Sequence, residues 1–392
     1  MTTPAQRKQH EQWLLELTGI PTAAGKEDRL IAWVQAWVEK RKGLKIKTDR
    51  AGNLFVSMKR GGGTSGGRNK KKPLLITAHL DHPAFVVRRL IDKETAELEF
   101  RGGVHNPYFE DARIEIFAPD DTVHRAVLKK LAPEAKPFKR IIARLENPRT
   151  SKALRPGDIG RWRFTGRVSK PIISGDRLQT NACDDLAAAA AALAAFDLMR
   201  RRKGFEHVGL LFTRAEEIGF VGTLAACVDK SIPKTARLLC LENSRSFPES
   251  PIGAGPILRV GDKMSVFGPD LTNRIDQVLT KHQKRNPSFK YQRKLMPGGT
   301  CEATAFSTWG WLSTCLCLPL ENYHNMHDID GVLAGKRPAR VAPESISIND
   351  YHGLIEMLIA ISKGLDDPKL PTLKSQLQAR LKKFGKIVYE SK

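Results

Sequence analysis

The stretch LLITAHLD, residues 74–81, decides the fold class that we predict for this chain. Its first five residues carry no charge, which is typical of a strand that is buried on both faces of a parallel sheet. Strand alternation then puts His79 and Asp81 on the same side, where the carboxylate can orient the imidazole. A single His-x-Asp is a weak motif, because polar residues often end a strand, so the rest of the chain must decide its meaning.

Other apolar stretches repeat this pattern after residue 183. Buried strands are predicted at 208–212 (VGLLF), 236–241 (ARLLCL) and 314–318 (TCLCL), and an alanine-rich helix at 186–200 (LAAAAAALAAFDLMR). Such alternation of strands and helices predicts an α/β fold with a mixed central sheet and helices on both faces.

Residues 86–175 do not follow this pattern. They alternate short apolar and charged stretches, contain several Gly and Pro, and show no long helical period. We therefore predict a small inserted β-rich domain over 86–175, which leaves 1–85 and 176–392 as one α/β domain.

Acidic residues and histidines stand at the ends of the predicted strands and at the start of the alanine-rich helix. Together with His79 and Asp81, the residues of interest are Asp184, Asp185, Glu216, Glu217, Glu242, His324 and His327. Each has an ordinary reading alone, such as a helix N-cap for the Asp pair or a solvated loop for the Glu pair. Because sites in open α/β sheets form at the carboxyl ends of strands, we expect the side chains to converge.

Two imidazoles and several carboxylates form a suitable ligand set for a pair of Zn²⁺-like ions about 3.5–4 Å apart. Glu216 would remain beside a ligand Glu217 as a spare general base. The chain has no H-E-x-x-H, which excludes a thermolysin-like metalloprotease by its motif.

Other motifs carry less information. A G-x-G-x-x-G match at 61–66 and a G-x-S-x-G match at 63–67 lie in the stretch 60–72, which we predict to be a loop between two strands, because neither leads into a helix. The six cysteines form no C-x-x-C pair, so we expect reduced, buried thiols rather than a zinc ribbon or a thioredoxin motif.

Charge and hydropathy bound the partners of the 392-residue chain. Its 65 Lys and Arg against 42 Asp and Glu give a net charge of +23, which first suggests a polyanionic partner. The basic clusters lie outside the predicted ligand segments, so we interpret them as solvated surface and require no nucleic acid. No apolar run approaches the ~18 residues of a membrane span, and the N-terminus lacks a signal-peptide pattern, so we expect a cytoplasmic protein without a membrane partner.

The last helical stretch carries an apolar stripe. Its members share one helical face, and we expect them to dock on the same fold rather than in a membrane; they are Leu373, Leu377, Leu381, Phe384 and Val388.

The chain resembles the co-catalytic metallo-aminopeptidases, most closely the glutamyl or tetrahedral aminopeptidase family among the di-zinc exopeptidases. Short segments match in the order of that family: 18–38, GNLFVSM (52–58), TAHLD (77–81), ACDD (182–185), EEIG (216–219), GAGP (253–256), GGT (298–300) and YH (323–324). Asp81 and Asp184 are 184 − 81 = 103 residues apart. The resemblance implies a β-domain inserted between them, with a role in dimerisation or as a lid, and residues 86–175 fit that insert.

The resemblance also implies a role for each residue. His79 would bind one metal, with Asp81 orienting it, and Asp184 would bridge both metals. Three further ligands and one base complete the implied site: Glu217 and Glu242 with one metal each, His324 at the second metal, and Glu216 as the base that takes a proton from the attacking water.

Four positions depart from the family pattern. Its usual Glu after His-x-Asp is replaced by His82, followed by Pro83 and Ala84, and its Asp-Asp-Arg ends in Leu186. Its usual Asp is Glu242 here, and His324 follows Tyr323 directly, so that His327 is an alternative ligand.

The implied activity is a metal-dependent aminopeptidase that removes N-terminal residues from peptides. The implied cofactors are two divalent ions, zinc with cobalt or manganese as alternatives, and the implied assembly ranges from a dimer to a dodecamer. Two alternatives stay open: another amide hydrolysis of this clan, such as that of a carboxypeptidase or deacylase, and a non-catalytic binding protein on the same fold. The preferred N-terminal residue is also left open.

Overall fold

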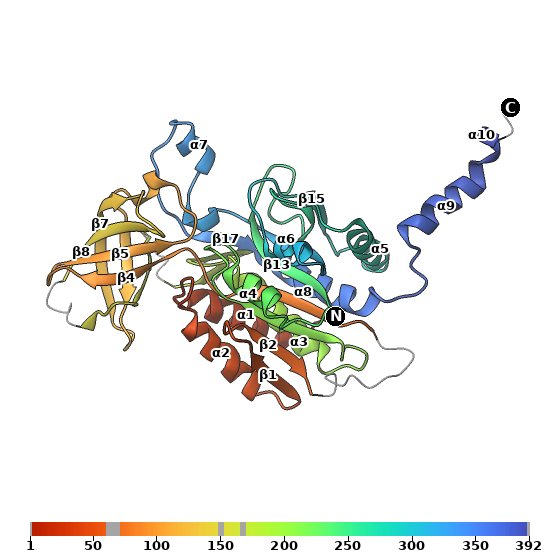
Figure 1. Ribbon diagram of the computed structural model, residues 1–392, viewed down its shortest axis with the longest axis horizontal. Helices are drawn as coiled ribbons and strands as arrows, with labels where there is room; N and C mark the ends of the chain where they lie inside the picture. Colours follow the sequence, from red (N-terminus) through yellow and green to blue (C-terminus); the bar gives the residue numbers. More distant parts are fainter. Residues whose placement is uncertain (1, 60–70, 148–152, 165–169, 390–392) are drawn as a thin grey trace.

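The computed structural model describes residues 2–59, 71–147, 153–164 and 170–389, so most of the predicted glycine-rich loop lies outside it. An eight-stranded sheet with helices on both faces forms the body of the molecule, and a closed barrel lies at one end (Figure 1). The predicted fold class is confirmed.

The large sheet places four parallel strands at its centre. The sheet order is β1-β2-β12-β3-β13-β16-β14-β15, with β12, β3, β13 and β16 parallel and the flanking β2 and β14 antiparallel to them. The strands span Leu44–Thr48 (β1), Leu54–Met58 (β2), Leu74–His79 (β3), Val208–Thr213 (β12), Arg237–Arg245 (β13), Ile257–Gly261 (β14), Gln292–Leu295 (β15) and Leu312–Leu320 (β16). The carboxyl ends of the central strands therefore meet at one edge.

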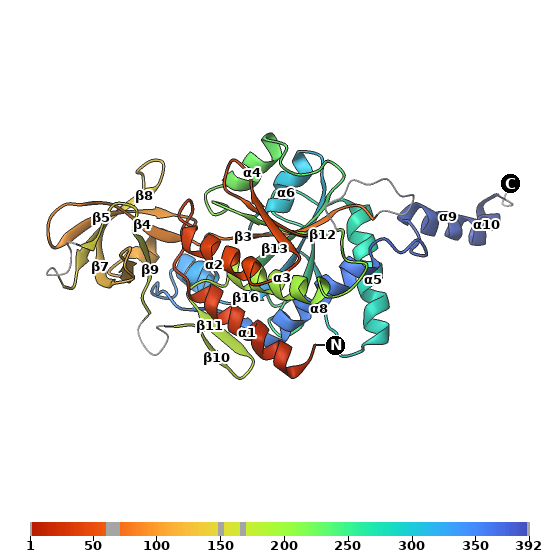
Figure 2. The ribbon, with the colours of Figure 1, turned by 90° about the horizontal axis from the view of Figure 1, so that it is seen from below.

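Side-chain alternation divides the core of this sheet into two layers. Leu74, Ile76 and Ala78 of β3 face a cluster that holds α3, while Leu75 packs against the cluster on the other face. The first layer contains α1 (Pro4–Gly19), α2 (Asp28–Glu39), α3 (Leu186–Met199), α5 (Pro269–Arg285) and α8 (Ile348–Gly364); the second contains α4 (Val221–Val228) and α6 (Glu302–Thr308) (Figure 2).

Helix α3 lies deepest. All of its residues are buried, and α1, α8 and β3 pack against it. Because alanine has no side chain beyond Cβ, the run of alanines lets these neighbours approach closely, as the composition predicts.

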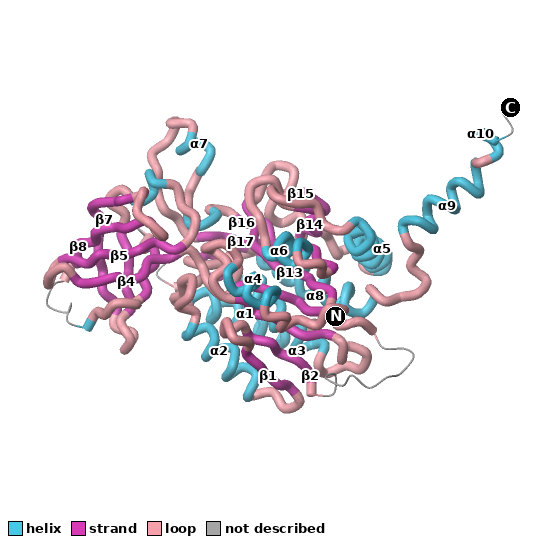
Figure 3. The backbone as a smooth tube through the Cα atoms, viewed as in Figure 1, coloured by secondary structure: helices cyan, strands magenta, loops and turns pink. Residues whose placement is uncertain are grey.

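The barrel closes in the order β4-β5-β8-β7-β6-β9, and its strands are joined by loops and the short helix η1 (Figure 3). Its core is aromatic, with Phe85, Phe100, Phe109 and Trp162 in edge-to-face or tilted contact. The elements span Ala84–Leu90 (β4), Thr95–Arg101 (β5), Asn106–Phe109 (η1), Arg113–Phe117 (β6), Val123–Ala132 (β7), Lys139–Leu145 (β8) and Ile159–Trp162 (β9). Closure leaves no free sheet edge.

The segment after β16 joins the two parts. It contains η3 (Tyr323–Asn325) and α7 (Ile329–Leu333), and Met326 and Ile329 pack into the barrel core. The Tyr108 hydroxyl of η1 donates to the carbonyl of His327 at 2.8 Å. A small sheet of β10 (Ile172–Ser174), β11 (Arg177–Thr180) and β17 (Glu344–Ser347) then leads back to the body.

The C-terminal helices α9 (Leu373–Phe384) and α10 (Lys386–Tyr389) extend away from the body in two views (Figures 1 and 2). Neither contains a buried residue, and Leu377, Leu381 and Phe384 are 54%, 56% and 52% exposed. The prediction that the apolar stripe docks on this chain is therefore wrong: the chain leaves the body after α8, and none of the described residues covers the stripe.

Two other predictions concern the whole chain. All six cysteines are free and buried, as expected. Among the described residues, no helix is both long and apolar enough to span a membrane.

Candidate metal centre

Three groups of ligand atoms converge at the carboxyl edge of the central strands, and within each group one atom of every residue lies within 4.8 Å of the others. Two of the groups share Asp184: one is His79, Asp184 and Glu242, and the other is Asp184, Glu217 and His324. The third group is His79, Glu216 and Glu217. The Nε2 atom of His79 is 3.5 Å from Oδ1 of Asp184, and Nε2 of His324 is 3.5 Å from Oδ2. Asp184 thus turns one carboxylate oxygen to each imidazole, which is the arrangement of a bridging ligand.

Each residue reaches this place from a different element. His79 ends β3, Glu242 lies within β13, and Asp184 precedes α3. Glu216 and Glu217 follow β12, and His324 follows β16. The peptide bond between Asp184 and Asp185 is cis. The parallel strands bring His79, Glu217, Glu242 and His324 to one edge of the sheet. Asp184 joins them from the segment between β11 of the small sheet and α3.

Three buried atoms at the centre have no hydrogen-bond partner among the described residues. They are Oδ1 of Asp184, Oε1 of Glu217 and Nε2 of His324. Buried polar atoms in proteins are usually paired, so three orphaned atoms within one cluster need an explanation. Two imidazoles and three carboxylates are a fitting donor set for divalent zinc-like cations, and such ligation would satisfy the orphaned atoms.

The charges of the cluster support the same reading. Burial raises the pKa of Glu242 well above its usual range, and the negative charges of Asp184 and Glu216 raise it further. Burial also raises the pKa of Glu216, with Glu217 and Asp81 adding to the effect. Bound cations would relieve this crowding of carboxylates.

Asp81 orients two parts of the centre. Its carbonyl oxygen lies 3.1 Å from Nδ1 of His79 and its Oδ1 atom lies 3.5 Å from the same nitrogen, on the side of the ring away from Asp184. The backbone N–H groups of Glu216 and Glu217 donate to its two oxygens at 2.9 and 3.0 Å. The sequence pattern predicts that the carboxylate of Asp81 orients His79; in the structure the carbonyl oxygen is the nearer partner and the carboxylate supports the Glu216–Glu217 turn, which is not visible in a sequence.

His324 and His327 differ clearly in position. His324 is buried, and its Nδ1 lies 2.6 Å from the carbonyl oxygen of Gly103, which leaves Nε2 facing the cluster. His327 instead contacts Oδ1 of Asn322 at 3.0 Å and the guanidinium of Arg340 at 2.6 Å. The structure brings His324 into the cluster and not His327.

Two buried side chains beside the cluster escape the sequence pattern. Glu344 accepts hydrogen bonds from the backbone of Cys183, Asp184 and His324, and His82 contacts the carbonyl of Asp184. Glu344 lies twenty residues after His324 and belongs to no recognisable motif, so the sequence does not identify it as part of the site. His82 was visible only as a departure from the family pattern.

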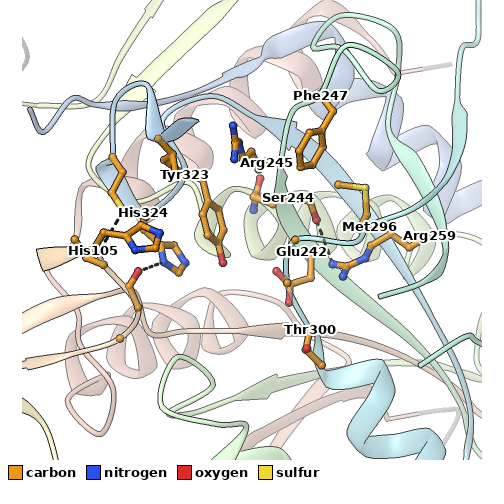
Figure 4. Close-up of a pocket in the computed structure, with 18 of the residues that line it drawn as sticks. His105, Glu242, Ser244, Arg245, Phe247, Arg259, Met296, Thr300, Tyr323 and His324 are labelled. Carbon is orange, nitrogen blue, oxygen red and sulfur yellow. Dashed lines mark hydrogen bonds between the residues drawn. The ribbon is translucent and has the colours of Figure 1, made fainter. Parts of the chain in front are cut away.

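A pocket of about 450 Å³ opens beside Glu242 and His324 (Figure 4). The barrel contributes Gly102–His105 to its lining, β13 contributes Asn243–Arg245, and Met296 and Phe247 add apolar surface.

Three basic side chains also line this pocket: Lys139, Arg245 and Arg259. Arg259 is buried and donates to Oγ of Ser244 at 3.2 Å, and its Nε has no partner among the described residues. A buried cation at the wall of the pocket can pair with an anionic group of a ligand.

The fold, the cluster and the adjoining pocket define a peptide-bond hydrolase of the metallo-exopeptidase class. The chain belongs to the M42 glutamyl aminopeptidase family, whose model matches residues 62–336. No curated protein sequence matches it.

Solved structures share the fold at low sequence identity. The TET aminopeptidase from a marine sediment Thaumarchaeota archaeon is 18% identical with a TM-score of 0.70, covering 92% of this chain and 98% of that one. An aminopeptidase from Desulfurococcus kamchatkensis is 18% identical with a TM-score of 0.69, covering 94% and 99%. The TET1 peptidase of Pyrococcus horikoshii, described as assembling into a tetrahedron or a large octahedral shell, is 17% identical with a TM-score of 0.67, covering 90% and 99%.

Proposed function

We propose that this protein is an aminopeptidase that uses two divalent cations to remove N-terminal residues from peptides. The observation that carries the proposal is the pair of ligand groups that share Asp184 and hold three orphaned buried atoms. Zinc suits these ligands best, with cobalt or manganese as alternatives.

The residues divide into two cation sites. His79, Asp184 and Glu242 would hold one ion, and Asp184, Glu217 and His324 would hold the other. The bound cations would supply Lewis acidity toward the scissile carbonyl.

Glu216 is the proposed general base. Its carboxylate is buried within the centre, 4.0 Å from Nε2 of His79. Glu216 is in neither of the two ligand groups that share Asp184, and it forms the third group with His79 and Glu217. A carboxylate oxygen of Glu216 takes the proton of the attacking water and delivers it to the leaving amine nitrogen. Asp81 keeps Glu216 in place through its backbone.

The test is the variant Glu216→Gln, which keeps the shape of the side chain and removes its basicity. We expect two bound cations by elemental analysis and a fall in kcat of about 10²–10⁴-fold on a peptide substrate. Glu217→Gln is the matched control, because it should lose a cation as well as activity. Full activity of metal-loaded Glu216→Gln would contradict the mechanism, and a protein that neither contains nor responds to metal would contradict the site.

The pocket also indicates a substrate preference. We propose that Arg259 pairs with an acidic side chain at the N-terminus of the peptide, because this cation is buried at the pocket wall with an unused N–H. We expect kcat/KM to be higher for substrates with an N-terminal Glu than for substrates with an N-terminal Leu. In Arg259→Met we expect the reverse order, with the Glu-to-Leu ratio of kcat/KM lowered by at least about tenfold. Lys139→Met is the control, because Lys139 lines the same pocket but its Nζ already donates to the carbonyl of Val104 and to Oδ1 of Asn106. An unchanged ratio in Arg259→Met would contradict the preference.

The alternatives give different results in the same assays. Cleavage of N-acylated but not free-amino peptides would indicate the related deacylase activity, and release of C-terminal residues a carboxypeptidase. The complete ligand set beside Glu216 argues against a binding protein without catalysis.

Assembly and location complete the proposal. We propose a homo-oligomer, between a dimer and a dodecamer, in which the barrel region 86–175 serves dimerisation or covers the active site. Light scattering of the purified protein measures that state. We also propose a cytoplasmic location and no requirement for nucleic acid, with the excess positive charge as solvated surface.

A further inference from the structure

The second cation site forms only if two loops from distant parts of the chain keep a fixed position relative to each other. One contains Asp184 before α3, and the other contains His324 in η3. The second loop is held in an unusual conformation, since Asn322, His324 and Asn325 have φ values of 55°, 53° and 63°. Residues without glycine's freedom adopt this left-handed region at a cost, so surrounding contacts must hold them there.

Glu344 contacts both loops at once. One carboxylate oxygen, Oε2, accepts the N–H groups of Cys183 at 2.6 Å and Asp184 at 3.1 Å, and the other, Oε1, accepts the N–H of His324 at 2.8 Å. The side chain is fully buried. A single carboxylate therefore fixes the spacing between the backbones of two proposed ligands.

His82 makes a second link between the same loops. Its Nδ1 lies 2.7 Å from the carbonyl oxygen of Asp184, and its Nε2 lies 3.2 Å from Oδ1 of Asn325, the neighbour of His324. The amide nitrogen of Asn325 donates to the carbonyl of Asn181, in the strand-to-helix segment that leads to Asp184. His82, which replaces the usual Glu of the family pattern, thus connects the two loops through its ring nitrogens.

We propose that Glu344 and His82 are positioning residues that set the separation of Asp184 and His324, and thereby the affinity of the cation site formed by Asp184, Glu217 and His324. Neither side chain belongs to the two ligand groups that share Asp184. The inference rests on the proposed function for the identity of the sites, but its measurement is metal binding rather than activity.

Substitution of Glu344 or His82 should change the cation affinities of the two sites by different amounts. Asp184 belongs to both sites, so each can weaken when its backbone is released. The other ligands of the first site, His79 and Glu242, hold their positions through β3 and β13, and the contacts of Glu344 and His82 do not include them. His324 has no such strand to fix it. Loss of a positioning residue should therefore weaken the second site more than the first.

The experiment is calorimetric titration of Zn²⁺ into the metal-free protein. Wild type should bind two ions per chain. Glu344→Ala leaves three N–H groups unpaired, and we expect it to bind the second ion about 10–100-fold more weakly, the usual effect of losing a group that orients a ligand. His82→Phe preserves the ring and removes both nitrogens, and it should act in the same direction.

A partial rescue separates positioning from folding. Glu344→Gln keeps one acceptor oxygen, so its second-site affinity should fall between those of wild type and Glu344→Ala. A matched control lies on the same segment and should bind both ions as wild type does: Glu321→Ala, whose side chain is 53% exposed.

The outcomes are distinct. Two unchanged affinities in both Glu344→Ala and His82→Phe would overturn the inference while leaving the proposed function intact. An equal loss at both sites with a lowered melting temperature of the metal-free protein would show general damage and would also overturn it. Failure of wild type to bind any divalent cation would refute the proposed function itself. A selective loss at the second site, with Glu344→Gln intermediate, supports the inference.

Discussion

At the scale of single residues, the neighbouring acids Asp184 and Asp185 have opposite electrostatic environments. His324 and His79 lower the pKa of Asp184 against the effect of its burial, so this carboxyl is charged. Burial raises the pKa of Asp185 well above its usual range, and Oδ1 of Asp185 accepts a hydrogen bond from Asn243. Only Asp184 faces both imidazoles, so the two positions should tolerate an amide differently.

We therefore expect Asp184→Asn to lose tight binding of both cations, because it removes the one negative charge that the two sites share. Asp185→Asn is the matched control and should keep both ions, since an amide resembles a neutral carboxyl. Metal content after dialysis, measured beside the melting temperature of each variant, checks this. Retention of two ions by Asp184→Asn would mean that the bridging role is wrong.

The residues of the centre were open to prediction to different degrees. His79, Asp184, Glu217 and Glu242 stand where apolar segments end, and such positions can be found in a sequence because buried charge needs a partner. Glu344 could not be found in this way, because its partners are backbone N–H groups, which every residue has. His324 and His327 could be separated only by the turn that follows β16.

At the scale of secondary structure, helix α3 is the element with the least room for change. All fourteen of its residues are buried, and it contacts α1, α8 and β3. The alanine run predicts a closely packed helix. This part of the fold can be predicted from sequence because small side chains allow neighbouring elements to approach closely. The order of the barrel strands was not readable, because strand pairing depends on contacts far apart in sequence.

We expect Ala191→Leu in α3 to lower the free energy of unfolding by about 1–3 kcal/mol, because three extra carbons must fit into a filled core. Ala379→Leu on the exposed helix α9 is the matched control and should change it by less than about 0.5 kcal/mol. Chemical denaturation of both variants in the metal-free state measures the difference. Equal stabilities would show that the space around α3 is looser than the structure indicates.

At the scale of the whole molecule, the active centre depends on contacts between the barrel and the body. The segment after β16 reaches the barrel through Met326 and Ile329, and Gly103 of the barrel meets the ring of His324. The chain carries a net charge of +23, whereas the side chains of this centre are mostly acidic. The net charge therefore indicates the function less directly than the ligand residues at the edge of the central sheet do.

The C-terminal helices α9 and α10 extend away from the central sheet and the barrel (Figures 1 and 2). Arg274 of α5 donates to the carbonyl groups of Leu365 and Asp367, which fixes the chain where it leaves α8, but no residue of α9 or α10 is buried. A chain ending at Pro371 should therefore keep its metal content and its peptide cleavage. Its melting temperature should change by less than about 2 °C, because exposed side chains contribute little to the free energy of unfolding. Thermal unfolding and light scattering of the shortened protein and the full chain, at equal concentration, test this expectation. A fall of more than about 5 °C would mean that the apolar stripe is covered in solution, and a simultaneous loss of mass would identify a second copy of the chain as its partner.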